Sequence, residues 1–192
     1  MMDIVITKLN KAYSEKQVLR DFSARFPQGQ TTVIMGPSGC GKTTLLSILM
    51  GFLSPDSGEI AGLPKKISAV FQEDRLCEDF SALSNVSMVL SGKSPEPERL
   101  LRLLGLGAEL KSPVKALSGG MKRRVAIARA LCYEGDLLIL DEPFKGLDGE
   151  TRKTVMEVVA GETPGRTVIA VTHDPEEAAF LSENIIRMEV IS

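Results

Sequence analysis

The sequence has no tryptophan, three cysteines and a single histidine, His173. An odd number of cysteines without a CxxC spacing does not indicate a disulfide framework, and one histidine does not indicate a zinc site, so a reducing compartment is expected. No segment approaches the roughly 20 apolar residues that a membrane-spanning helix requires, and the N-terminal stretch alternates like a strand instead of resembling a secretion signal. Any work at a membrane is therefore expected to take place at its surface.

The chain also lacks an excess of charge of either sign. Lys and Arg number 23 and Asp and Glu number 25, which gives a net charge of -2, so no nucleic-acid partner is indicated. The basic cluster 122–124 is interpreted as the solvated face of a helix, because no aromatic platform accompanies it. With 43% hydrophobic residues, 192 residues are expected to form a single compact domain, 1–192.

Two kinds of periodicity alternate along the chain. Short β-type runs occur at 3–7, 30–35, 66–71, 136–141, 166–172 and 184–190, and helical patterns occur at 42–51, 150–161 and 175–183. This alternation predicts an α/β fold with a mainly parallel central sheet covered on both faces. Between residues 73 and 117 the β-type runs stop, which predicts a small helical subdomain inserted between two segments of a catalytic core, 1–72 and 118–192.

The stretch GPSGCGKTT at 36–44 contains the phosphate-binding pattern GxxxxGKT, placed between a β-type run and a helical one. Glycines let backbone N–H groups converge on phosphate oxygens at a helix N-terminus. We predict that Lys42 reaches the outer phosphates, that Thr43 is a Mg²⁺ ligand and that Thr44 contacts the inner phosphates. The rest of the predicted phosphate site consists of Gly36, Pro37, Ser38, Gly39, Cys40 and Gly41. The alternative is a glycine-rich turn without function.

Two adjacent acids, Asp141 and Glu142, follow the apolar run LLIL. They are expected at the carboxyl edge of the sheet, where ligands of open α/β folds bind. Because successive strand residues face opposite sides, the two acids are expected to have different roles. Asp141 is the candidate Mg²⁺ ligand, and Glu142 is the candidate base that polarises the attacking water. The alternative is that both acids merely end a strand at the surface.

A second glycine-containing helix start follows the predicted subdomain. Ser118, Gly119 and Gly120 offer a hydroxyl, a close backbone approach and the positive end of a helix dipole, which together suit a terminal phosphate. Because this loop lies beyond the subdomain, we do not expect it to reach residues 36–44 of its own chain. In a head-to-tail homodimer each ATP would be held by residues 36–44 of one copy and by residues 118–120 of the other.

Six stretches in order, GPSGCGKTT, VFQED, LSGGM, LLILDE, KGLD and VTHD, resemble the motifs of the nucleotide-binding subunits of ATP-binding-cassette transporters. The resemblance covers nearly the whole chain and implies a P-loop NTPase (RecA-like) core with an N-terminal antiparallel β portion. It implies that Tyr13 stacks on adenine and that Gln72 contacts Mg²⁺ and the attacking water. It also implies that Asp148 communicates between the two sites and that His173 touches the γ-phosphate. The alternatives are that Tyr13 is an ordinary, partly buried tyrosine and that His173 has a structural role.

The resemblance also implies cofactors, partners and a location. ATP and Mg²⁺ are the expected cofactors. The expected partners are a second copy, separate integral membrane permease subunits and, indirectly, an extracytoplasmic substrate-binding protein. VFQEDRL and DEPFKGLD resemble importer ATPases of the nitrate, sulfonate, taurine or thiamine-precursor type. This implies a peripheral ATPase at the cytoplasmic face of the membrane, and the shortness of the chain implies no C-terminal regulatory domain.

Three other hypotheses compete with an importer subunit: an exporter ATPase, a cassette ATPase of a soluble process, and a nucleotide-gated switch with negligible turnover. Repair cassettes carry long coiled coils and translational ones carry two cassettes per chain, and this sequence has neither feature. Glu142 and His173 argue against the switch, because both are suited to hydrolysis. The sequence names neither the transported solute nor the direction of transport.

Overall fold

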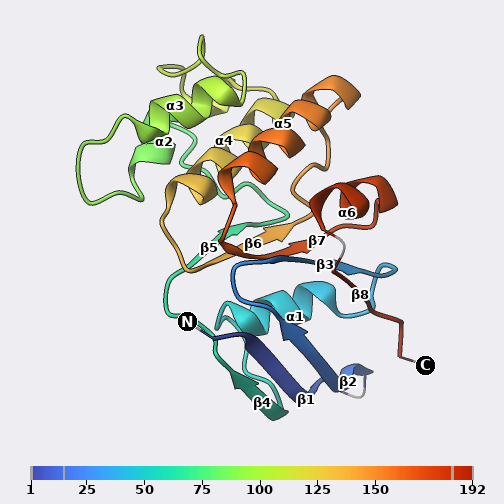
Figure 1. The fold of residues 1–192 in the computed structure, drawn as a ribbon. Coiled ribbons are helices and arrows are strands. Elements are labelled where there is room, and N and C mark those ends of the chain that lie inside the picture. Colours follow the sequence, from blue (N-terminus) through green and yellow to red (C-terminus); the bar gives the residue numbers. More distant parts are fainter. Residues whose placement is uncertain (1, 15, 183, 192) are drawn as a thin grey trace.

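The computed structural model describes residues 2–14, 16–182 and 184–191, and within them two β-sheets and the surrounding helices stack in layers (Figure 1). The strands are β1 (Ile4–Tyr13), β2 (Lys16–Phe26), β3 (Thr31–Met35), β4 (Ser57–Ala61), β5 (Ile67–Val70), β6 (Leu137–Asp141), β7 (Thr167–Val171) and β8 (Ile185–Arg187). The α-helices are α1 (Lys42–Leu49), α2 (Ala82–Ser87), α3 (Glu96–Leu103), α4 (Gly119–Cys132), α5 (Gly149–Glu162) and α6 (Pro175–Leu181).

The central sheet has the strand order β5-β6-β7-β3-β8, and all of its neighbouring strands are parallel. Every residue of β6 and β7 is buried, because helices cover both faces of the sheet. In Figure 1, α1 lies on one face, and α4, α5 and α6 lie on the other. The prediction of an α/β fold with a mainly parallel sheet is confirmed.

The second sheet is antiparallel, has the order β2-β1-β4, and lies on the far side of α1 from the central sheet (Figure 1). Apolar side chains from β1 and β2, such as Ile6 and Phe26, pack with Leu46 of α1 and Ile139 of β6 in one buried cluster. The N-terminal antiparallel β portion is therefore confirmed. Strands β2 and β4 were not expected from the pattern, because both expose most of one face and carry polar residues throughout.

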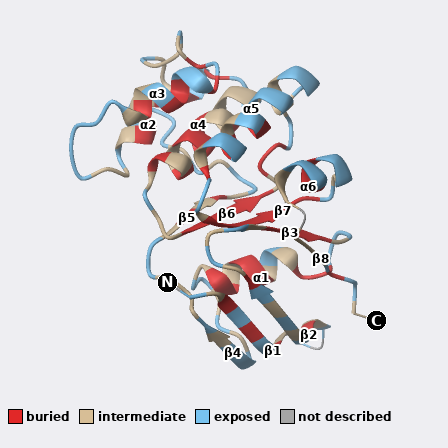
Figure 2. Cartoon of the chain, viewed as in Figure 1, coloured by how far each residue is buried: buried red, intermediate tan, exposed pale blue. Residues whose placement is uncertain are grey.

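Residues 73–117 contain α2, α3 and a 3₁₀ turn at Val114–Ala116, as the helical pattern predicts. Helices α2 and α3 pack on α4, and Leu101 of α3, Val125 of α4 and Leu140 of β6 belong to one buried cluster. Figure 2 shows this continuous burial from the sheet into the helical layer. Because α4 packs against both parts, the boundaries of the inserted subdomain stay a prediction.

Four of the described helices begin at side-chain caps: Ser81 caps α2, and the caps of the other three belong to stretches that the sequence singled out. The side chains of Ser118, Asp148 and Asp174 accept hydrogen bonds from backbone N–H groups in the first turns of α4, α5 and α6. Helix α6 ends at Leu181, and residue 183, the last of its predicted range, lies outside the described residues. In the part of the chain that the structure describes, no helix is both long enough and apolar enough to span a membrane.

Candidate functional site

A cavity of about 670 Å³ opens at the carboxyl ends of β3, β6 and β7. Its volume falls within the range of ligand pockets, about 300–1,000 Å³. Parallel strands bring segments that are far apart in the sequence to this one edge. The predicted site residues that line the cavity are Tyr13, Gly36, Pro37, Ser38, Gly39, Gly41, Lys42, Thr43, Thr44, Gln72, Asp141, Glu142 and His173.

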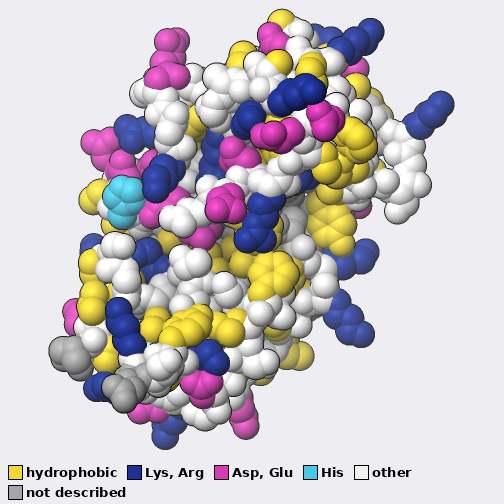
Figure 3. All heavy atoms as spheres, turned by 180° about the vertical axis from the view of Figure 1, so that it is seen from behind, with side chains coloured by type: hydrophobic (Ala, Val, Ile, Leu, Met, Phe, Trp, Pro, Cys, Tyr) yellow, Lys and Arg dark blue, Asp and Glu magenta, His cyan; other side chains and the backbone are white. Residues whose placement is uncertain are grey.

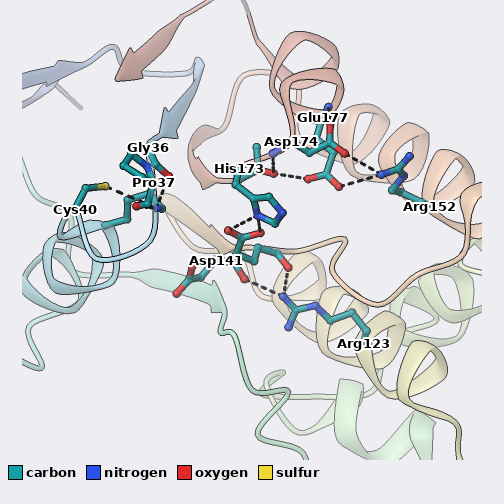
Figure 4. Close-up of polar contacts among 12 residues, drawn as sticks. Gly36, Pro37, Cys40, Arg123, Asp141, Arg152, His173, Asp174 and Glu177 are labelled. Carbon is teal, nitrogen blue, oxygen red and sulfur yellow. Dashed lines mark hydrogen bonds and ion pairs between the residues drawn. The ribbon is translucent and has the colours of Figure 1, made fainter. Parts of the chain in front are cut away.

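The loop after β3 forms one wall of the cavity and ends at the N-terminus of α1. Gly41, immediately before α1, has φ 99°, and a Cβ added there would lie 2.8 Å from the carbonyl oxygen of Val18. The Lys42 ammonium donates hydrogen bonds to the carbonyl oxygens of Gly36 (2.7 Å) and Pro37 (2.8 Å), as Figure 4 shows. A cationic side chain and a helix N-terminus therefore face the same space, an arrangement that suits an anion such as phosphate.

Asp141 and Glu142 form the opposite wall. Asp141 is the last residue of β6 and is buried, so desolvation, and next the neighbouring charge of Glu142, raise the pKa of its carboxyl group. Glu142 follows in the left-handed region of the backbone, with φ 49°. The turn directs its carboxylate toward His173, whose Nδ1 lies 2.8 Å from the nearer oxygen (Figure 4).

The hydrogen bond that the protonated His173 ring donates to Glu142 is the main cause that raises the pKa of His173, and the charge of the same carboxylate adds to it. His173 itself is well exposed, with 71% of its side chain accessible to solvent, whereas 12% of the Glu142 side chain is accessible. Because the folded-state pKa of His173 is raised, the contact stabilises the fold fully below the ordinary value of 6.5, and this contribution is lost as the pH rises through the raised pKa.

This contact can be measured directly, because His173 is the only histidine in the sequence. In a tag-free protein the Hε1 proton of its ring gives a single histidine Hε1 signal in the NMR spectrum, whose shift follows the titration. We expect Glu142→Gln to lower the pKa of His173 toward 6.5, since the charge that favours the imidazolium is removed. Glu150→Gln, which removes an exposed acid from the first turn of α5, should leave this pKa unchanged. An unchanged value in Glu142→Gln would contradict the observed pairing.

The oxygen donors of Thr43, Gln72 and Asp141 all line the cavity, and hard oxygen ligands are those that Mg²⁺ prefers. Within residues 2–14, 16–182 and 184–191, no group of three His, Cys, Asp or Glu side chains could hold a metal ion. The donor set therefore fits a Mg²⁺ ion that takes its remaining ligands from water and from phosphate oxygens, and not a site built by the protein alone.

Five predicted site residues do not line the cavity. Ser118, Gly119 and Gly120 lie at the start of α4, and Asp148 caps α5, so none of the four contributes to the cavity wall of its own chain. Cys40 is buried beneath the loop and lines a separate cavity of about 280 Å³. Its predicted contact with phosphate stays a prediction.

The cavity also includes residues that the sequence did not single out: Lys16, Val18 and Lys145. Lys16 pairs with Tyr13 in the β1–β2 ladder. The predicted role of Tyr13 could therefore have indicated that Lys16 also lies at the cavity. Lys145 follows Glu142 by three residues, close to the carboxyl end of β6. Both side chains add positive charge to a cavity that is predicted to hold phosphate.

The interpretation of the cluster 122–124 as a solvated face is wrong for Arg123, which is 4% exposed. Its guanidinium group donates to backbone carbonyl oxygens at the end of β6 and to Phe71. Arg124 is half-buried and donates to the carbonyl oxygen of Leu104, whereas Lys122 forms a surface ion pair with Glu78. Composition alone could not separate these cases, because burial depends on which face of α4 meets the sheet.

Comparison with known proteins decides the family. The family model described as "ABC transporter" matches residues 19–145, which is more than half of the chain. The chain belongs to the ABC transporter family. The matched segment includes the loop at 36–44, Gln72, the start of α4 and the pair Asp141–Glu142, so most of the candidate site lies within it.

Several curated members of the ABC transporter family are similar along most of this chain. The aliphatic sulfonates import ATP-binding protein SsuB 2 of Pseudomonas fluorescens is 37% identical, and the match covers 97% of this chain and 73% of that protein. The taurine import ATP-binding protein TauB of Pseudomonas aeruginosa is also 37% identical, with 91% and 72% covered. The spermidine/putrescine import ATP-binding protein PotA of Fusobacterium nucleatum is 36% identical, with 97% and 54% covered.

A solved structure supports the fold independently. The dimeric ATP-binding cassette MJ0796, in a post-hydrolysis state bound to ADP and Pi, superposes with a TM-score of 0.85 at 29% identity, covering 97% of this chain and 96% of that one. A second dimeric structure of MJ0796, described as a bacterial ABC transporter cassette, gives a TM-score of 0.83. The P-loop ATPase fold of the ABC cassettes is therefore shown for this chain.

Proposed function

We propose that this chain is the ATP-binding and ATP-hydrolysing subunit of a membrane importer and that it acts as a homodimer at the cytoplasmic face of the membrane. The observation that carries the proposal is the shared cavity, which brings the 36–44 loop, Gln72, the Asp141–Glu142 pair and His173 together at one edge of the sheet. Family membership and the import names of several relatives support it.

The chemistry proposed for this cavity is phosphoryl transfer to water, which depends mainly on positioning and on charge stabilisation. The 36–44 loop and Lys42 would hold the triphosphate, and Tyr13, half exposed at the rim, would stack on adenine. Glu142 would accept a proton from the attacking water. His173 would contact the γ-phosphate and keep its hydrogen bond with Glu142. A Mg²⁺ ion held by Thr43, Gln72 and Asp141 would supply additional charge stabilisation.

A second copy completes the proposed site. Ser118, Gly119 and Gly120 present the capped N-terminus of α4, yet they lie outside their own chain's cavity. In a head-to-tail dimer these residues would reach the γ-phosphate held by the other copy, and Asp148, at the start of α5, would contact the facing subunit. The dimeric state of the MJ0796 structures supports a dimer of this chain.

The proposed permease would contact the side of the molecule that carries β5 and α2. A groove of about 390 Å³ lies there, and its wall includes Phe71 next to Gln72, Met88 after α2, and Tyr133 after α4. Met88 is 45% exposed, and the exposed Phe52 stacks against Phe71 of the groove wall. Figure 3 shows apolar side chains along this edge among charges of both signs, which suits a partner that docks from the membrane.

The cargo would be selected by the permease and by an extracytoplasmic substrate-binding protein, not by this subunit. Relatives of nearly equal identity are named for sulfonate, taurine and spermidine/putrescine import. The residues that line the cavity would contact nucleotide and not cargo. We favour import of the sulfonate or taurine type, because most of the similar relatives carry those names.

Paired sites give this proposal a kinetic test. If hydrolysis requires two copies, phosphate release by the purified chain should rise faster than linearly with protein concentration in dilute solution, approaching the second power well below the dimer dissociation constant. The measurement is steady-state ATPase activity over a dilution series, with the oligomeric state checked by light scattering. Activity strictly proportional to concentration down to a demonstrated monomer would reject the paired-site mechanism.

A further inference from the structure

Arg123 is the most completely hydrogen-bonded buried cation in the described part of the chain. It lies in the second turn of α4 with 4% of its surface exposed. A guanidinium group has five N–H donors, and each of them has an acceptor here. Since burying a charge costs free energy unless its hydrogen bonds are satisfied, this arrangement requires several acceptors held at fixed positions around one side chain.

Three of those acceptors are consecutive backbone carbonyls at the end of β6. Nη2 donates to the oxygens of Asp141 (2.8 Å) and Glu142 (2.6 Å), and Nε donates to that of Pro143 (2.9 Å). Figure 4 shows Arg123 reaching the turn that begins at Asp141, with His173 on the other side of that turn. The turn thus directs its carbonyls toward the guanidinium group and the carboxylate of Glu142 toward His173.

The other two acceptors belong to the segment around Gln72. Nη1 donates to the carbonyl oxygen of Phe71 and to the carboxylate of Asp74, at 3.1 Å from the latter. Phe71 also lines the groove beside β5 and α2, where the permease is proposed to bind. One side chain therefore joins the segment that carries Gln72 to the segment that carries Glu142.

The other arginines of α4 do not make this connection. Arg129 donates to the carbonyl oxygens of Asp74 and Arg75 and so holds the Gln72 segment alone. Arg124 donates to Leu104 and to Gly120. Among the described arginines of this helix, Arg123 alone contacts both catalytic segments.

The conformation of Glu142 makes this contact important. A non-glycine residue at φ 49° is strained by about 1–3 kcal/mol and keeps that conformation only where its surroundings enforce it. Without the guanidinium group, the carbonyls of residues 141–143 would converge on a buried space with no donor. The turn would then relax, and the carboxylate of Glu142 would move away from its position beside His173.

We propose that Arg123 is a positioning residue for ATP hydrolysis, which fixes the Glu142 turn relative to the Gln72 segment so that both side chains meet the same water. This inference rests on the proposed roles of Glu142 and Gln72. The 36–44 loop makes no hydrogen bond with Arg123, so we expect the triphosphate to bind to that loop without it. The step affected is turnover, where a displacement of about 1 Å costs about 10²-fold.

The test compares Arg123→Gln and Arg123→Lys with Lys122→Gln as the matched control. Lys122 is the preceding residue of α4 and pairs only with Glu78 at the surface, so its variant removes one charge from the same helix. We expect Arg123→Gln to lower kcat about 10- to 100-fold with the ATP dissociation constant changed less than about twofold. Lysine, with three donors, should restore part of the rate. Lys122→Gln should retain both the kcat and the ATP dissociation constant of the unmodified chain.

The NMR signal of His173 separates positioning from a general loss of stability. If Arg123 acts through Glu142, Arg123→Gln should lower the pKa of His173 toward its value in Glu142→Gln. The double variant should then show no additional change. A kcat and a His173 pKa both unchanged in Arg123→Gln would overturn the proposal. Parallel losses of ATP affinity and kcat would also overturn it, because they indicate a merely structural role.

If Arg123→Gln does not fold, Arg123→Lys decides the question by the same two measurements. A lysine variant with unchanged kcat and an unchanged pKa of His173 would overturn the proposal. Failure of the underlying function gives a different result: Glu142→Gln itself would then hydrolyse ATP at the rate of the unmodified chain, whatever the Arg123 variants do.

Discussion

Replacing Glu142 by glutamine is expected to lower kcat by about 10²–10⁴-fold, which corresponds to about 3–5 kcal/mol of transition-state stabilisation. Glutamine keeps the shape of the side chain but has no carboxylate to take a proton from water. The substitution does not change the loop at 36–44, which includes Lys42, so the ATP dissociation constant should change little. The measurements are steady-state phosphate release and equilibrium binding of a fluorescent ATP analogue.

The same variant should accumulate an ATP-bound dimer, because nucleotide that is not hydrolysed keeps the two copies together. Gel filtration with ATP and Mg²⁺ should show Glu142→Gln eluting as a dimer under conditions in which the unmodified chain elutes as a monomer. Glu150→Gln, which replaces an exposed acid at the start of α5, serves as the control and should behave like the unmodified chain. Full turnover in Glu142→Gln would exclude this residue as the base.

Ser118→Arg is expected to abolish turnover, with a fall in kcat of about 10²-fold or more, while one chain still binds ATP. Ser118 lies outside the cavity of its own chain, so the nucleotide held by residues 36–44 is not disturbed. In the proposed dimer the same residue faces the γ-phosphate of the other copy, where a bulky side chain would block closure. Phosphate release and nucleotide affinity are the two quantities to compare.

This variant also removes a helix cap, since the Ser118 side chain accepts a hydrogen bond from the N–H of Met121. Loss of a cap costs about 1 kcal/mol of stability whatever the role of the residue. Ser81→Arg is the matched control, because Ser81 caps α2 in the same way through the N–H of Ser84. Similar destabilisation with normal turnover is expected for Ser81→Arg. Normal turnover in Ser118→Arg would count against a contact between copies.

Much of the fold and of the cavity could be predicted from sequence because local patterns carried the information. The continuous apolar runs of β6 and β7 indicated buried parallel strands. The motif at 36–44 and the acids at 141 and 142 then indicated where the strands end and where a ligand would lie. Strands β2 and β4 were missed, because exposed and polar strands have a weak pattern.

The same sequence reasoning failed for Arg123, and the reason is physical. A run of basic residues on a helix does not indicate which of them points toward the sheet. In addition, the carbonyl acceptors of Arg123 come from segments that are 18 to 52 residues away in the sequence. Lys16 and Lys145 are similar cases, since their place in the cavity wall depends on how β2 and the turn after β6 are oriented.

The amino-acid sequence alone determined the family of this protein, the phosphate loop and the two acids, because each of these depends on residues that are neighbours in the chain. The tertiary structure decided which distant residues meet. It placed His173 against Glu142 and enclosed Arg123 within carbonyls from two segments. The physical reason is that parallel strands gather distant loops at one edge, and only packing fixes which side chains face inward there.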